Sequence, residues 1–177
     1  MRSLFSAVVL AVTISLPAVS AQGPVTKATV PGVVNFAKVE TTVACAGATS
    51  PEALAEVKKL GYASVINLRV PGEAGFDADV EATAARAAGI NYVHLPFNAA
   101  SPDPMLVDNF LKAVTDKANQ PAFIHCASAN RAAALWMIKR IAVDKWAVDR
   151  AAEEAAALGL TNPNLKTFAI EQAQKRQ

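Results

Sequence analysis

One stretch, residues 122–135, constrains the fold of this chain more than any other. It reads AFIHCASANRAAAL: an apolar run ending in His125 and Cys126, a short loop of small residues, and a helix-forming segment that opens at Arg131. This order predicts a buried strand, a tight loop and a helix N-terminus. The free amide groups of the loop and of the first helical turn would then converge on one point and form a site for an anion.

Cys126 and Arg131 give this predicted anion site its chemistry. The partial positive charge of the helix end and the fixed charge of Arg131 favour the nucleophilic thiolate form of Cys126. Arg131 can hold a tetrahedral oxyanion through two parallel N–H groups. The loop residues expected to bind the same anion are Ala127, Ser128, Ala129 and Asn130. A buried Cys is also a common small hydrophobe, so the prediction depends on His, Cys and Arg occurring together.

The rest of the chain alternates short apolar runs with amphipathic segments. We expect strands at 39–45, 63–68, 90–95 and 122–125, helices at 51–60, 77–88, 105–117, 131–141, 146–159 and 163–174, and an extended arm at 22–37 that joins the sheet. Strands separated by helices in this way indicate βαβ units. The predicted fold is therefore α/β, with a mainly parallel sheet of four to five strands and helices on both faces.

Three loops rich in polar side chains each follow a predicted strand. They are the segment 67–73, the segment 98–103 and the Cys126–Arg131 loop. Ligands of parallel sheets bind beyond the carboxyl ends of the strands, where such loops meet. The sequence thus predicts one site at one edge of the sheet.

Residues 1–21 have the pattern of a secretory signal peptide. Arg2 supplies a positive start, residues 4–16 are almost wholly apolar, and Val19-Ser20-Ala21 are small residues suited to cleavage. The apolar run is too short to span a bilayer comfortably. We expect residues 22–177 to be a single domain that is periplasmic or secreted, with no membrane segment after cleavage.

Charge and cysteine content exclude several classes of function. The formal net charge is +2, and Arg2 is lost with the signal, so neither nucleic acid nor an anionic membrane is an expected partner. Cys45 and Cys126 are too few for a disulfide framework or a Cys-based zinc site, and we expect no metal or cofactor. Export allows one Cys45–Cys126 disulfide, although that bond would block the nucleophile. The expected ligand is a phosphorylated or other oxyanion substrate, and no protein partner is indicated.

Several segments together resemble one bacterial family. They are VNF at 34–36, SPEAL at 50–54, GY at 61–62, VINLR at 65–69 with Glu73, and HCASANR at 125–131. Over roughly Asn35 to Lys145 the chain is similar to the phosphatase-like domain of beta-lactamase hydrolase-like proteins, a relative of the dual-specificity cysteine phosphatases. The resemblance implies a cysteine phosphatase-like fold and hydrolysis of phosphate monoesters through a phosphocysteine. Cys126 would attack phosphorus, Arg131 and the loop amides would stabilise the equatorial oxygens, and His125 would help to hold the thiolate or serve only in the core.

The chain departs from the superfamily pattern at the loop and at the acid. Those phosphatases usually place five residues between Cys and Arg, whereas four stand here, and Ala129 replaces the usual loop glycine. Asn98 stands where the general-acid aspartate is expected, and an amide cannot donate as an acid. Asp103, five residues on, can take that role or can cap the helix that begins beside it.

Two other interpretations remain open. The six-residue loop from Cys126 to Arg131 also resembles rhodanese-type sulfurtransferases, in which the Cys carries a persulfide and no acid is needed. A third interpretation is an exported, catalytically weak relative that keeps the anion site.

Overall fold

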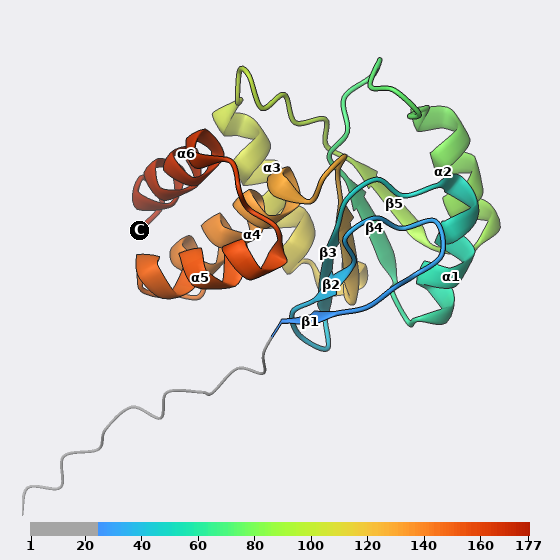
Figure 1. Ribbon diagram of the computed structural model, residues 1–177, viewed down its shortest axis with the longest axis horizontal. Coiled ribbons are helices and arrows are strands. Elements are labelled where there is room, and N and C mark those ends of the chain that lie inside the picture. The colour runs from blue at the N-terminus through green and yellow to red at the C-terminus, as the bar shows by residue number, and fades with distance from the viewer. Residues whose placement is uncertain (1–24) are drawn as a thin grey trace, which may run out of the picture.

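A six-stranded sheet forms the middle of the molecule in the computed structural model, which describes residues 25–177 (Figure 1). The expected signal peptide, residues 1–21, lies outside the described residues. The strand order is β1-β2-β3-β6-β4-β5. The strands are β1 (Thr26–Lys27), β2 (Ala37–Lys38), β3 (Val43–Ala46), β4 (Ser64–Asn67), β5 (Asn91–His94) and β6 (Ala122–His125).

Strands β3, β6, β4 and β5 are parallel to one another, whereas β1 and β2 pair antiparallel at the other edge of the sheet. The mainly parallel sheet is confirmed, but the expected count of four to five strands is wrong. The difference lies in the arm predicted at 22–37. Its residues form β1, and the chain then turns back as β2, which pairs with β3 and extends the sheet by two short strands.

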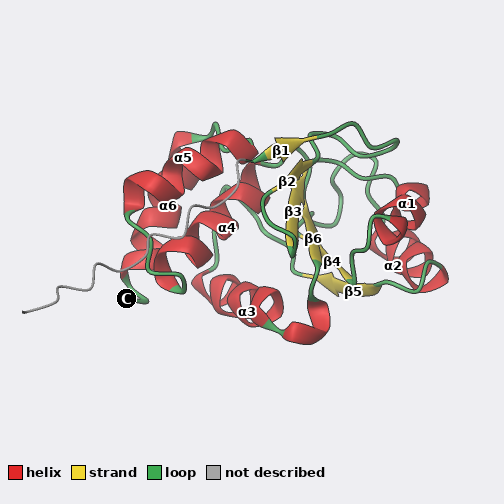
Figure 2. Cartoon of the chain, turned by 90° about the horizontal axis from the view of Figure 1, so that it is seen from below, coloured by secondary structure: helices red, strands yellow, loops and turns green. Residues whose placement is uncertain are grey.

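Within residues 25–177, six α-helices cover the sheet in two layers, as predicted. They are α1 (Leu54–Lys59), α2 (Ala78–Ala87), α3 (Pro104–Thr115), α4 (Asn130–Ala142), α5 (Val148–Leu158) and α6 (Pro163–Gln174), with short 3-10 turns at Pro51–Ala53 and Lys117–Asn119. Helices α1 and α2 lie on one face of the sheet and α3 to α6 on the other (Figures 1 and 2). Because β4, β5 and β6 are parallel, the connections that follow these strands leave the same end of the sheet.

Local sequence sets where these helices begin and end. Asp77, Asp103 and Asn162 each accept hydrogen bonds from the first free amides of α2, α3 and α6. Proline stands in the first turn of α3 and α6, where its missing N–H costs nothing. Gly159 ends α5 with a φ of 113°, a conformation that an L side chain rarely adopts.

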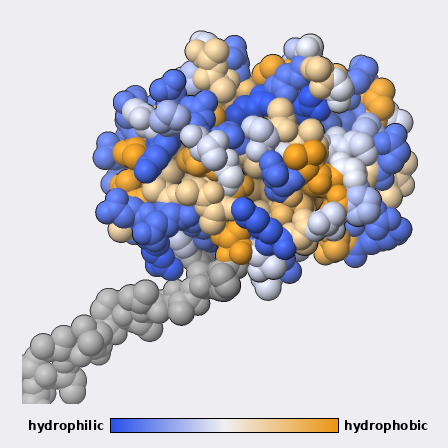
Figure 3. Space-filling view, viewed as in Figure 1, coloured by the Kyte–Doolittle hydropathy of each residue, from blue (hydrophilic) through white to orange (hydrophobic). Residues whose placement is uncertain are grey.

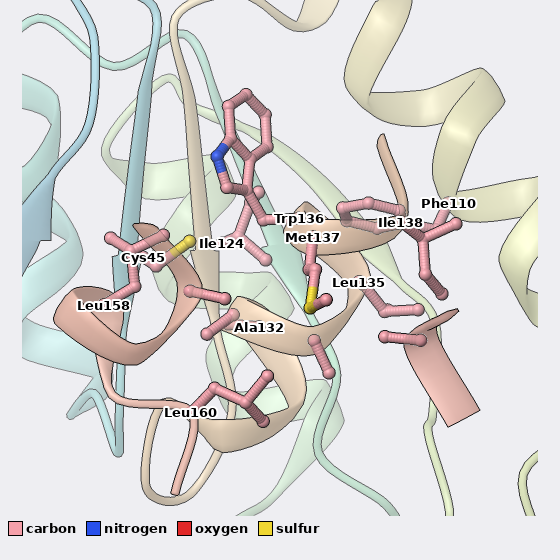
Figure 4. Packing of buried hydrophobic residues seen from close by; sticks show 14 of the residues in the cluster. Cys45, Phe110, Ile124, Ala132, Leu135, Trp136, Met137, Ile138, Leu158 and Leu160 are labelled. Carbon is pink, nitrogen blue, oxygen red and sulfur yellow. The ribbon is translucent and has the colours of Figure 1, made fainter. Parts of the chain in front are cut away.

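The larger hydrophobic core lies between the sheet and helices α3 to α6. Helix α4 is buried along nearly its whole length, because its alanines let α5 and α6 pack close to it. Figure 4 shows Cys45 of the sheet and Leu158 of α5 beside Ala132 of α4, with Ile124 and Leu135 in the same core. A smaller core lies under α1 and α2, where the ring of Phe36 stacks on that of Phe123 at 6.2 Å.

Arg140 forms a buried polar centre at the end of α4. Its guanidinium lies 4.6 Å from the ring centroid of Trp136 and 4.2 Å from that of Trp146. Three carboxylates bind it: those of Glu40 at 2.8 Å, Asp144 at 2.9 Å and Glu154 at 2.7 Å. Every nitrogen of this side chain has an acidic partner.

The surface is mixed in character. The face shown in Figure 3 carries hydrophilic side chains around its rim and hydrophobic ones across its middle. Within residues 25–177, none of the helices combines the length and the apolar character that crossing a membrane requires.

Candidate active site

The loop that follows β6 leads from the sheet directly into α4. Cys126 comes one residue after the strand, and Asn130 is the first residue of the helix. Ala129 caps the helix in the left-handed region, with φ 77°. Gly159 passes so close that an added Cβ there would lie 3.2 Å from Cβ of Ala129. The missing side chain at Gly159 thus leaves room for Ala129 of the loop after β6.

Three neighbouring segments hold the outer side of the loop. The amide of Ala48 donates to the carbonyl of Ala127 at 2.9 Å. The side-chain amide of Asn35 donates to the carbonyl of Ser128 at 3.5 Å. Oδ1 of Asn130 accepts from the amide of Thr161 at 2.7 Å and from that of the next residue, Asn162, at 2.9 Å. Oδ1 of Asn130 therefore fixes the α5–α6 connection, and the backbone amide of Asn130 stays available for a ligand.

The inner side of the loop presents free N–H groups. Within residues 25–177, the amides of Ala127, Ser128, Asn130 and Arg131 donate no hydrogen bond to another residue. These groups stand at the N-terminus of a 13-residue helix, where the partial charge is positive. Such an array binds anions. We call these four amides, with Cys126 and the Arg131 guanidinium, the anion cradle.

Arg131 is fixed along one edge of its guanidinium. Nη1 and Nη2 donate to the two carboxylate oxygens of Glu73 at 2.6 and 2.9 Å. Nη1 also donates to the carbonyls of Leu68 at 3.1 Å and Phe97 at 2.9 Å. Nε and the second hydrogen of Nη2 have no oxygen acceptor among residues 25–177, and the side chain has a further hydrogen bond with the Cys126 thiol. The edge formed by Nε and Nη2 is thus the one left for a ligand.

Glu73 is held as a carboxylate. Burial opposes its ionisation, yet hydrogen bonds from Arg131, from the amide of Val70 and from Arg69 lower the pKa of Glu73 to about 2. In turn, burial alone would lower the pKa of Arg131, but Glu73 and the nearby Cys126 raise it above its ordinary value. The pair therefore stays charged throughout the physiological range.

Cys126 is buried and adjoins the charged group of Arg131. Its exposed fraction is 0%, and it belongs to the larger core, which is the usual setting of a structural cysteine. Its position beside the guanidinium distinguishes it from Cys45. Burial, with the neighbouring Cys126, raises the pKa of the Cys45 thiol. Both cysteines are free thiols in this structure.

His125 points to the opposite face of the sheet from Cys126, because successive residues of a strand alternate in direction. Its Nε2 lies 2.7 Å from Oε1 of Glu81 on α2, and both side chains are buried. Asn67 donates to the other oxygen of Glu81 at 2.9 Å. Among residues 25–177, Nδ1 of His125 is the buried side-chain nitrogen or oxygen without a partner. His125 thus lies behind the nucleophile, outside the anion cradle.

The loop after β5 meets the anion cradle only where it begins. The carbonyl of Phe97 binds Arg131, and the next residue, Asn98, uses its side chain to accept the amide of Ala100 at 3.0 Å. Asp103 is exposed and caps α3 by accepting the amide of Met105 at 2.9 Å. The structure therefore shows the capping role of Asp103. Proton donation by this residue stays a prediction.

The predicted convergence is confirmed for the segment 67–73 and the Cys126–Arg131 loop, which Arg131 joins through the carbonyl of Leu68 and the carboxylate of Glu73. From the loop after β5 it contacts only the carbonyl of Phe97, the residue before the predicted segment 98–103. Sequence reasoning placed Glu73 in a polar loop without a role. It missed Glu81, whose only sign was an acidic residue four positions before a buried alanine, on the core-facing side of α2.

The described residues offer no ready metal site. Within residues 25–177 there is no group of three or more His, Cys, Asp or Glu side chains that could hold a metal ion.

Comparison with known proteins gives one family and one fold. A family model described as "Beta-lactamase hydrolase-like protein, phosphatase-like domain" matches residues 35–143. A comparison with curated protein sequences found no significant match. Among solved structures, 80 chains match significantly.

Three of these structures illustrate the likeness in fold. A Shewanella putrefaciens protein of the DUF442 phosphatase group is 20% identical with a TM-score of 0.71, covering 82% of this chain and 95% of that one. TpbA of P. aeruginosa is 20% identical with a TM-score of 0.65, covering 90% and 92%. The catalytic domain of the PP-IP phosphatase SIW14 of S. cerevisiae is 18% identical with a TM-score of 0.66, covering 80% and 87%.

Proposed function

Because the chain belongs to the family of the beta-lactamase hydrolase-like protein, phosphatase-like domain, we propose that it hydrolyses phosphate monoesters with Cys126 as nucleophile. One observation carries the proposal. Cys126 lies at the N-terminus of α4 beside an arginine whose guanidinium is fixed on one edge and open on the other. A purely structural cysteine has no need of such a neighbour.

In the first step, the Cys126 thiolate attacks phosphorus. The S–P bond forms as the bond between phosphorus and the ester oxygen breaks, and the leaving group departs as the alkoxide or phenolate, which takes a proton from solvent. The open edge of Arg131 and the free loop amides donate to the three equatorial oxygens, where negative charge is concentrated in the transition state. The bidentate contact with Glu73 fixes the guanidinium beforehand, so little reorganisation is needed during the reaction.

In the second step, water attacks the phosphocysteine. The O–P bond forms, the S–P bond breaks, and inorganic phosphate leaves as the thiolate is regenerated. The same donors stabilise the same oxygens in both steps, because the phosphoryl group stays in the anion cradle. No metal takes part in this scheme.

The leaving group determines which esters react well. Glu73 is the carboxylate that contacts Arg131, and with a pKa of about 2 it is not a proton donor near neutral pH. Asp103 is engaged at the start of α3. We therefore expect aryl phosphates, whose phenolate departs without a proton, to react faster than alkyl phosphates. One neighbouring structure, of P. aeruginosa TpbA, is a complex with phosphotyrosine, which is an aryl ester.

Export belongs to the same proposal. The pattern of residues 1–21 supports cleavage after Ala21 and a periplasmic or secreted location. Expression of the full chain in a Gram-negative host, followed by mass spectrometry of the periplasmic fraction, tests this. A mature chain that begins at Gln22 is expected, and a protein that keeps residues 1–21 in the cytoplasm would contradict it.

The activity is tested with 4-nitrophenyl phosphate. The wild type should release nitrophenol, and a rapid acid quench with ³²P-labelled substrate should trap phosphate on Cys126. Cys126→Ser should lose both signals, whereas the control Cys45→Ser, on the neighbouring strand, should keep both. Equal turnover by the wild type and Cys126→Ser would refute the nucleophile.

Sulfur transfer is the second candidate, favoured by one specific observation. Asp103 is occupied as a cap and Asn98 as a turn former, so neither is positioned as the acid that alkyl phosphates need. Sulfur transfer needs only a thiolate beside an anion site. Cys126 would take the outer sulfur of thiosulfate, release sulfite and pass that sulfur to cyanide. Thiocyanate formation at a higher kcat/KM than 4-nitrophenyl phosphate hydrolysis would favour this reaction over the phosphatase.

A further inference from the structure

A cavity of about 360 Å³ adjoins the outer wall of the anion cradle. Ser128 and Asn130 of the loop form one wall, and Thr161 of the α5–α6 connection forms another. The third wall is the N-terminal arm, with Lys27 on β1 and Asn35 before β2. Cys126 does not line this cavity, so it is distinct from the cradle and shares a wall with it.

The charge of the cavity is unbalanced. Lys27 is the one charged residue among those that line it, and no carboxylate does. A second hollow, of about 500 Å³, shares Lys27 and Asn35 and also has no acidic residue in its lining. Within residues 25–177, the Lys27 ammonium makes no ion pair or side-chain hydrogen bond. The cavity thus presents an unpaired cation among amide and hydroxyl groups, which suits an anion.

The arm directs Lys27 toward the cavity through the register of its strands. Lys27 pairs with Ala37 across β1 and β2, and Ala37 lines the same cavity. Thr26 pairs with Lys38, so Lys38 points to the opposite face of this ribbon. The two lysines are therefore a matched pair, eleven positions apart on paired strands, with one at the cavity and one away from it.

The wall between cavity and cradle is held firmly. Asn130 binds two amides of the α5–α6 connection, and Nδ2 of the same side chain donates to Oγ of Ser128 at 3.3 Å. A phosphoryl group in the cradle would contact the amide of Ser128 from one side. The ester oxygen lies opposite the attacking sulfur, at the mouth of the cradle, so its substituent would pass over the rim of the loop at Ser128 to reach the side where Lys27 stands.

We propose that this cavity binds a second anionic group of the substrate, with Lys27 as the residue that selects for it. The inference rests on the proposed function. The substrate class is small aryl phosphate monoesters that carry a second phosphate or a carboxylate. Lys27 acts as a point charge at an exposed position, so its contribution should be severalfold in affinity and should weaken with salt.

Three substrates built on one ring test the proposal. They are phenyl phosphate, 3-carboxyphenyl phosphate and 1,3-phenylene bisphosphate, compared by kcat/KM at low ionic strength. We expect the two esters that carry a second anionic group to exceed phenyl phosphate in kcat/KM by about threefold to fivefold, the range of a weakly screened ion pair. Comparison of the two substituted esters shows whether a carboxylate or a second phosphate is preferred.

Variants of Lys27 and Lys38 show which lysine is responsible for the preference for a second anionic group. Lys27→Met should bring both ratios close to one, Lys27→Arg should restore them in part, and Lys38→Met should leave them unchanged. Raising the salt concentration should reduce the ratios in the wild type but not in Lys27→Met. Ratios near one in the wild type, or unchanged ratios in Lys27→Met, would overturn the proposal.

Binding separates this inference from the proposed function. Calorimetric titration of the Cys126→Ser variant with phenyl phosphate and 3-carboxyphenyl phosphate gives the same ratio without turnover. If the wild type hydrolyses none of the esters but the carboxylate still strengthens binding through Lys27, then the phosphatase proposal fails and the cavity proposal stands. If the esters are hydrolysed and binding does not discriminate, then the cavity proposal alone fails.

Discussion

Helix α4 carries a buried arginine at each end, and the two differ in what their partners leave free. Arg140 is 1% exposed and Arg131 is 9% exposed. Carboxylates bind all three nitrogens of Arg140, and tryptophan rings cover its faces. Arg131 has a single carboxylate, Glu73, on one edge of its fork.

The difference shows how a binding group can be recognised in the absence of a ligand. A saturated guanidinium such as Arg140 joins α4 to α5 and to the chain before β3, and has nothing left to offer. An arginine that serves a ligand must be fixed without being saturated. Glu73 fixes Arg131 in that way, since it leaves Nε and one Nη2 hydrogen available beside Cys126.

Replacement of each arginine by lysine should give the largest contrast. Arg131→Lys should lower kcat/KM for 4-nitrophenyl phosphate by about 10²- to 10³-fold, the cost of one lost oxyanion donor, because lysine cannot supply two parallel N–H groups. Arg140→Lys should keep activity but lose stability on the order of 2 kcal/mol as its stacking between rings is weakened. Steady-state kinetics and urea unfolding measure the two effects.

The same pair of variants can break the comparison. Each should be assayed at a temperature where both are folded, so that loss of stability is not mistaken for loss of activity. Nearly full turnover in Arg131→Lys would mean that the open edge binds nothing. A large activity loss in Arg140→Lys would mean that the saturated arginine is not merely structural.

Glu73 should make stability depend on pH, and Glu73→Gln should remove that dependence. A carboxyl whose folded pKa is lowered stabilises the folded state above its unfolded pKa, here about 4.5, and the gain is lost as the pH falls toward about 2. A shift of this size corresponds to roughly 3 kcal/mol. The difference in unfolding free energy between wild type and variant should therefore be largest near pH 6 and should shrink steadily below pH 4.5. A difference that stays constant down to pH 2.5 would contradict the pairing.

The fold followed from sequence where the signal was local and periodic. The helix over residues 163–174 was predicted with its actual bounds, since Asn162 and Pro163 mark its start. The arm joins the sheet as predicted, but its two short strands were not placed, because two-residue pairings leave no alternation in the sequence. Their partners lie about ten residues away, and only the folded sheet edge selects them.

The site followed from sequence only in part, for a similar reason. Cys126 and Arg131 stand in one contiguous motif, so their proximity could be predicted. The partner of Arg131 is Glu73, 58 residues earlier, and the partner of His125 is Glu81, 44 residues earlier. Long-range pairs of this kind depend on how β4, β6 and α2 pack, which no local pattern encodes.

The two cysteines extend the comparison to the thiols beside the sheet. Cys126 adjoins Arg131, whereas burial raises the pKa of Cys45 and keeps it as the thiol. We expect iodoacetamide at neutral pH to modify Cys126 at least about ten times faster than Cys45, because only the thiolate reacts. Peptide mass spectrometry over a time course measures both rates in the folded protein. Equal and slow labelling of the two would make Cys126 an ordinary core residue.

The smallest effect is expected for Asp103→Asn. This substitution tests whether the carboxylate of Asp103 acts in catalysis together with Cys126 and Arg131. Asparagine caps a helix about as well as aspartate, so the substitution keeps the hydrogen bond to the amide of Met105 and removes only the acid. As a pure cap, the variant should hydrolyse 4-nitrophenyl phosphate and an alkyl phosphate within about twofold of the wild type, with a melting temperature within a few degrees. The control Asp103→Ala loses the cap and should cost about 1 kcal/mol of stability. A selective loss of about 10²-fold on the alkyl ester alone would instead make Asp103 the proton donor, because only a poor leaving group needs the proton. The ratio between the two esters decides the matter independently of stability, since unfolding would lower both rates together.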